Sequence, residues 1–235
     1  MLIVNGRSFY TGLSMAAGFG VVLVLLFLPI VRGRTPLAAA DDLFNSVAKQ
    51  SSYFIPELRK HASAHRGMLL DMRLTLPDAD AAAKAAEVLG ADGIEASATG
   101  AVVALRGDLG HLLGAALEDA DEMFGNRAGA AGGGHGLGAR EAMFARWQAL
   151  KQMSRQLRTA NEFEKASAVE EVITKGLEVS YNFYGITPSP GSAHAGVLGM
   201  ALVFYLLYTV WWGYAIMWLS DGIGLQMKAS GRREH

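Results

Sequence analysis

Two long uncharged stretches lie near the ends of the chain, at residues 8–31 and 195–220. All Asp, Glu, Lys and Arg residues fall outside them. A helix needs roughly 20 apolar residues to cross the hydrocarbon core of a bilayer, and both stretches are long enough. The pattern predicts a two-pass membrane protein with an N-terminal tail at 1–12, transmembrane helices at 13–32 and 196–220, and a basic C-terminal tail at 221–235.

The segment at 33–66 is predicted to be helical. Thr35 can cap a helix whose first turn holds Pro36, because proline suits a position that needs no N–H donor. Pro56 interrupts this helix and starts a second, shorter one that ends near His65.

A strand with one buried face follows this helical segment. Apolar residues occupy positions 68, 70, 72, 74 and 76 and alternate with Leu69, Asp71, Arg73 and Thr75. This period of two is typical of a half-buried strand. Asp78 then opens an alanine-rich helix that ends at Gly90.

A hairpin and an amphipathic helix complete this region. Thr99 and Gly100 separate two short apolar runs and predict a tight turn, and Asp108 can cap the helix after it. Residues 67–125 are therefore expected to fold as β-α-β-β-α, most of a ferredoxin-like split βαβ unit without its last strand. Such a three-stranded sheet has an open edge that can accept a strand from this chain or another.

The rest of the water-exposed region divides into linkers and helices. A glycine-rich linker is predicted at 126–138, a helical stalk at 139–185 and a Pro/Gly linker at 186–195. A phosphate-binding loop is the alternative for the glycine run, but the strand before it and the P-loop lysine after it are both missing. The expected fold class is thus an α+β membrane protein whose two transmembrane helices flank the α/β domain and its stalk.

Composition excludes several classes of function. The 235 residues carry 21 basic and 22 acidic side chains, so the net charge of −1 argues against nucleic-acid binding. The chain has no cysteine, which excludes disulfides, thiolate metal sites, iron–sulfur clusters and thioether-linked haem.

Few residues suggest chemistry. Glu57, His61 and His65 are four apart and would share one helix face, a spacing that can bind a metal but is also common on a solvated face. Four acidic residues lie within positions 118–122. They are interpreted either as a solvated helix face or as a docking surface for a basic partner. His111, His135 and His194 have no catalytic companions in the sequence, so no catalytic, cofactor-binding or metal-binding residue is predicted.

The membrane helices suggest packing rather than transport. Neither predicted span has a central ionisable residue, although transporters and proton pumps use such groups or broken helices. Small residues recur every four positions in the first span, and aromatic residues cover the middle and end of the second. The second helix could pack on other protein helices or on a lipid or quinone-like molecule, or it could face lipid as one thick aromatic belt. The predicted packing or partner surface comprises Gly12, Ala16, Gly20, Phe204, Tyr208, Trp211, Trp212 and Trp218.

Basic residues near the second span set the expected orientation. Lys228, Arg232 and Arg233 follow it closely and favour a cytoplasmic C-terminus. The chain is therefore expected in the inner (plasma) membrane, with both termini in the cytoplasm and the soluble domain in the periplasm.

Three functions fit these observations. The leading hypothesis is a non-catalytic accessory or scaffold subunit of a larger membrane complex, with respiratory complexes among the candidates and other membrane subunits as partners. The second is an extracytoplasmic sensor or ligand-binding module. The layout, with Pro188 and Pro190 before the second span, is similar to that of the polysaccharide co-polymerases, and this resemblance implies a homo-oligomeric assembly regulator.

Overall fold

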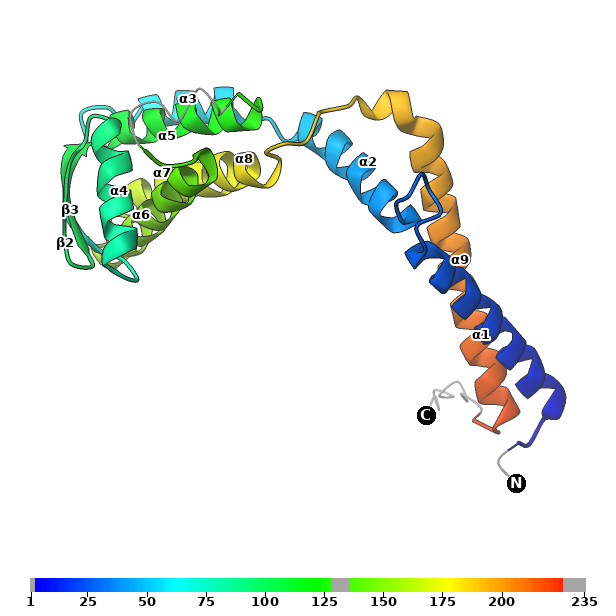
Figure 1. Ribbon diagram of the computed structural model, residues 1–235. Coiled ribbons are helices and arrows are strands. Elements are labelled where there is room, and N and C mark those ends of the chain that lie inside the picture. Colours follow the sequence, from blue (N-terminus) through cyan, green and yellow to red (C-terminus); the bar gives the residue numbers. More distant parts are fainter. Residues whose placement is uncertain (1–2, 128–135, 226–235) are drawn as a thin grey trace, which may run out of the picture. The chain divides into compact units, whose positions relative to one another are not determined.

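The computed structural model describes residues 3–127 and 136–225. The chain forms two compact units, one made of residues 1–47 and 189–235 and the other of residues 48–188. The first unit contains two long apolar helices, and the second contains a mixed α+β fold with a three-stranded antiparallel sheet (Figure 1).

Helices α1 (Gly6–Phe27) and α9 (Ala195–Gly222) are long and apolar enough to cross a membrane, and most of their surface is exposed. α1 begins and ends earlier than the predicted span at 13–32. It begins at Gly6 because the Asn5 side chain accepts a hydrogen bond from the Ser8 N–H at 3.3 Å. It ends before Pro29, which forces the preceding residue into extended backbone.

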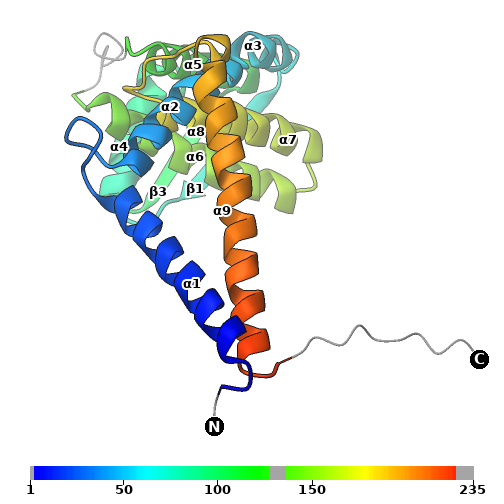
Figure 2. The same cartoon turned by 90° about the vertical axis from the view of Figure 1, so that its right-hand side faces the viewer.

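α1 and α9 pack against each other most closely where the chain begins and α9 ends, and they spread apart toward the other end (Figure 2). The N–H groups of Val4 and Asn5 donate to the Gly222 carbonyl at 2.9 and 3.0 Å. A Cβ atom placed on Gly12 would lie 2.6 Å from the Leu219 backbone nitrogen, so only glycine permits this approach.

The helices predicted for 33–66 are present. α2 (Pro36–Ser51) starts at the expected proline, and the Thr35 hydroxyl accepts the Ala38 N–H at 3.0 Å. α3 (Ile55–Ser63) contains Pro56 in its first turn and ends slightly before the expected His65.

The second unit contains the predicted β-α-β-β-α order. Antiparallel pairing places the strands in the order β1-β3-β2, with Met72 opposite Leu105 and Ala98 opposite Val103. Gly100 has the positive φ, 58°, that the tight turn between β2 and β3 requires. The elements are β1 (Leu69–Thr75), α4 (Ala79–Ala91), β2 (Glu95–Thr99), β3 (Val102–Asp108) and α5 (Leu109–Phe124).

Two aspartates fix the starts of the helices in this region, as the sequence predicts. Asp78 accepts the Ala81 N–H at 2.8 Å at the start of α4, and Asp108 accepts the His111 N–H at 2.7 Å at the start of α5. Each aspartate satisfies an N–H group that has no partner inside its own helix.

The helices after the glycine-rich segment, predicted as a stalk, contribute to the same buried core as the sheet. They are α6 (Ala139–Thr159), α7 (Phe163–Glu171), a π-helical turn η1 (Val172–Leu177) and α8 (Glu178–Asn182). Leu150 of α6 and Ile173 of η1 belong to the same buried cluster as Leu74 and Leu105 of the sheet. Figure 1 shows these helices gathered on one face of the sheet.

Replacement of Gly12 tests the α1–α9 contact. Gly12→Ala should destabilise the protein by about 1–3 kcal/mol, because the added methyl group meets α9 backbone and overpacks the contact. Gly20→Ala in the same helix is the matched control, since a Cβ atom there meets nothing within 4 Å. Thermal unfolding followed by circular dichroism in a mild detergent should separate the two variants, and equal midpoints would contradict the described packing.

Candidate functional site

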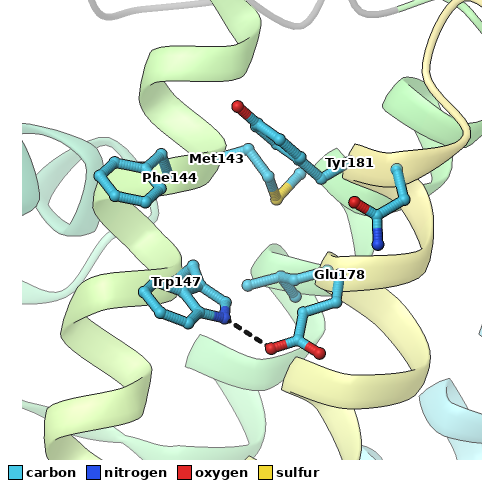
Figure 3. A pocket seen from close by; sticks show the side chains of 7 residues that line it. Met143, Phe144, Trp147, Glu178 and Tyr181 are labelled. Carbon is cyan, nitrogen blue, oxygen red and sulfur yellow. Dashed lines mark hydrogen bonds between the residues drawn. The ribbon is translucent and has the colours of Figure 1, made fainter.

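An aromatic pocket lies between α6 and the η1–α8 segment (Figure 3). Its volume is about 250 Å³, and most of its wall is formed by ring and hydrocarbon atoms. The lining residues are Met143, Phe144, Trp147, Leu177, Glu178, Tyr181 and Asn182.

One wall of the pocket comes from α6. Phe144 and Trp147 are three residues apart, so their side chains lie on the same helix face. Their ring centroids are 5.7 Å apart with 13° between the ring planes, which makes a continuous aromatic surface. Phe144 remains 50% exposed at the pocket mouth.

The opposite wall comes from α8 and contains the pocket's carboxylate. The Trp147 Nε1–H donates to Glu178 Oε1 at 2.9 Å and fixes the indole ring. Tyr181 lies three residues beyond Glu178 and extends toward α6 (Figure 3). The guanidinium of Arg140 lies 5.5 Å from the centroid of the Tyr181 ring and 5.4 Å from that of Tyr184.

Polar contacts join α6 to α7, the helix that precedes η1 and α8. Lys151 Nζ donates to Glu170 Oε1 at 2.8 Å, and the Ser154 hydroxyl donates to Glu170 Oε2 at 2.9 Å. The hydrogen bond from Lys151 is the main cause that lowers the pKa of the Glu170 carboxyl, and the bond from Ser154 acts in the same direction. These contacts fix α7, and with it the start of η1, against α6.

The free edge of β1 is a second candidate site. Leu76 N–H donates to the Ala101 carbonyl and Leu109 N–H to the Met68 carbonyl, so the even-numbered residues of β1 bond to β3. By the alternation of antiparallel strands, the backbone groups of Leu69, Asp71, Arg73 and Thr75 point away from the sheet.

A groove of about 400 Å³ runs along this edge, between β1 and the end of α6. Within the described ranges, the hydrogen bond found on the outward groups is from Gln156 Nε2 to the Arg73 carbonyl, at 2.7 Å. The sequence predicted an open edge, and the structure shows one that a single side chain covers in part.

The predicted metal candidates do not come together. His61 Nδ1 lies 3.1 Å from Glu171 Oε2, and His65 Nδ1 lies 3.0 Å from the His61 carbonyl. Over residues 3–127 and 136–225, no group of three His, Cys, Asp or Glu side chains could hold a metal ion. His111 is exposed with its Nε2 2.8 Å from the Asp92 carbonyl oxygen, and His135 lies outside the described residues.

Three of the four acidic side chains at 118–122 have partners in their own chain. Asp119 accepts from Arg146, Asp121 from Tyr53 and Arg59, and Glu122 from Arg127. These contacts neutralise much of the acidic patch and argue against its use as a docking surface for a basic partner.

The residues predicted as a membrane packing surface separate into two groups. Gly12, Tyr208 and Trp211 lie in the α1–α9 contact, where Phe19 stacks on Tyr208 at 4.0 Å and Trp211 Nε1–H donates to the Met15 carbonyl at 3.1 Å. Gly20 has open space beside it. Trp212 also contacts α1, since its ring centroid lies 4.5 Å from that of Phe19. Ala16 is half-buried, and Phe204 and Trp218 are exposed.

The sequence predicted the open edge of the sheet, but it did not identify the aromatic pocket as a site. A usable signal was the pairing of Phe144 with Trp147 and of Glu178 with Tyr181, each at a spacing of three on a helix. The pocket can hold a small apolar or cationic group, and the edge can bind an extended backbone. No family model, curated protein or solved structure matches the chain.

The Glu170 contacts predict a pH-dependent stability. A carboxyl whose folded pKa is lowered contributes stability above its unfolded pKa, and this contribution is lost as the pH falls through the folded pKa. Glu170→Gln should lower the midpoint of thermal unfolding near neutral pH. The difference between the midpoints of the variant and the parent protein should become smaller at about pH 3.

The exposed Glu164 of α7 supplies the control for this measurement, because Glu164→Gln should change the midpoint little at either pH. If the difference in midpoint between Glu170→Gln and the parent protein does not change with pH, the charge of the carboxylate is not what joins α6 to α7.

Proposed function

We propose that this protein is a non-catalytic accessory or scaffold subunit of a larger membrane protein complex. α1 and α9 form its membrane hairpin, and the α/β unit binds another subunit of the complex. The unpaired edge of β1 carries the proposal, because an edge strand with free N–H and C=O groups is a ready template for a partner strand.

The composition of the edge supports a protein partner. Leu69 is 72% exposed, and Asp71 and Arg73 are exposed beside it, so a partner strand would meet one apolar and two oppositely charged side chains. Gln156 bonds to one carbonyl, that of Arg73. A partner strand can displace it because this hydrogen bond is exposed to solvent. A strand seated in the groove would complete the fourth position of the split βαβ arrangement.

The hairpin supports a role within the membrane. Its contact uses glycine and aromatic residues, and a broad apolar surface remains on both helices for lipid or for helices of other subunits. In the proposed orientation both termini are cytoplasmic and the α/β unit is periplasmic, following the basic residues after the second span.

The composition of the purified particle tests this function. The tagged full chain, extracted in a mild detergent, should co-purify with different membrane subunits in fixed ratio by native gel sizing and mass spectrometry. A particle made of this chain alone would reject the proposal and favour the homo-oligomeric alternative.

Proline substitutions test the role of the edge. Asp71→Pro removes an outward N–H and leaves the β1–β3 bonds in place, so the partner subunit should be lost while the protein stays folded. Ala98→Pro is the matched control, because the alternation also turns its N–H outward, at the exposed edge of β2. Equal retention of partners by both variants would show that β1 is not the binding edge.

A further inference from the structure

We propose that the aromatic pocket between α6 and α8 binds a quaternary ammonium group, the chemistry of choline and related compounds. The inference concerns a small cation and is independent of any partner strand at β1. It rests on the types of side chain that line the pocket and on their arrangement (Figure 3).

Three aromatic side chains surround the space. Phe144 and Trp147 form one wall, and Tyr181 approaches from the other. The faces of aromatic rings carry partial negative charge and attract cations, and such cages are a known means of holding methylated ammonium groups. Tyr181 already serves as a platform for a cation in this protein, because the Arg140 guanidinium lies over its ring.

One carboxylate supplies charge complementarity. Glu178 lines the pocket, and its Oε1 accepts the Trp147 indole N–H. That bond holds the carboxylate against the aromatic wall, where it can neutralise a bound cation without contributing a proton donor. The floor is formed by Met143 and Leu177, which are buried and apolar.

The scarcity of acceptors selects a quaternary ammonium over a primary one. A primary ammonium has three N–H donors, each of which needs an acceptor when it leaves water. The pocket side chains that can accept strongly are Glu178 and Asn182. A quaternary ammonium has no N–H, so its methyl groups can contact the rings and the thioether of Met143 without an unsatisfied donor.

The charge of Arg140, which lies over the ring of the lining residue Tyr181, limits the affinity. Its positive charge lies beside Tyr181 and Tyr184 and opposes a second cation nearby. Binding is therefore expected to be moderate and to depend strongly on the Glu178 charge.

The test compares choline with its neutral isostere, 3,3-dimethyl-1-butanol, by titration calorimetry on the full chain in phosphatidylglycerol nanodiscs. Choline should bind, and the isostere should bind at least about tenfold more weakly, because it has the same shape and no charge. Absence of choline binding, or equal binding of the two compounds, would overturn the proposal.

Two variants locate the site. Glu178→Gln keeps an acceptor for Trp147 and should weaken choline binding by about tenfold, while the isostere is unaffected. Phe144→Leu changes a half-exposed ring, so it should fold normally and weaken choline binding several-fold. Glu164→Gln, a charge change outside the pocket, should leave binding unchanged. Unchanged choline binding in both pocket variants would place any observed binding elsewhere and reject the site.

Nanodiscs of phosphatidylcholine distinguish two sources of the quaternary ammonium group, a lipid headgroup and a water-soluble compound. If lipid headgroups reach the pocket, the apparent affinity for added choline should fall relative to phosphatidylglycerol discs. If the affinity is the same in both lipids, lipid headgroups do not compete for the pocket, and the proposed ligand is a water-soluble compound rather than a lipid.

Discussion

A buried guanidinium determines how the second unit is assembled. Arg146 of α6 is fully buried and donates to Asp92 Oδ1 at 2.6 Å, after α4, and to Asp119 Oδ2 at 2.5 Å, on α5. Arginine cannot shed its proton in a folded protein, so α6 can bury this side chain only where both carboxylates are in place. The contact therefore draws the helices after the glycine-rich segment onto the α/β layer and sets the position of Trp147, the next residue along α6.

Local signals were sufficient for the α/β unit and for most helix ends. The alternation around Met72, the caps at Asp78 and Asp108, and the turn at Gly100 depend on residues only a few positions apart. Sequence can therefore predict these elements, since the physical cause and its effect lie in the same short segment. The start of α1 at Gly6 was missed because a capping asparagine precedes a polar first turn, which hydropathy alone does not detect.

The relation between the helices and the sheet could not be predicted in this way. Arg146 and Lys49 are of charged residue types that usually lie on the surface, yet both are buried. Lys49 Nζ donates to the carbonyls of Phe183 and Ile186 at 3.0 and 2.7 Å, and burial lowers the pKa of this amine. The partners of both side chains are far away along the chain. The stalk was predicted from apolar residues at helical spacing, such as Leu150 and Leu157, and this spacing does not show which element the apolar face contacts.

The π-helical turn explains why the pocket faces α6. Gly176 brings η1 close to α5, since a Cβ atom there would lie 3.0 Å from Leu117 Cδ2. One extra residue in a helix rotates everything after it by about 100°, the angle between successive residues. This rotation lets Ile173 and Leu177 remain in the core while Glu178 and Tyr181 turn toward Trp147. In a regular α-helix Glu178 and Tyr181 would be turned by about this angle relative to α6, so the π-helical turn contributes to the direction in which the second wall of the pocket faces.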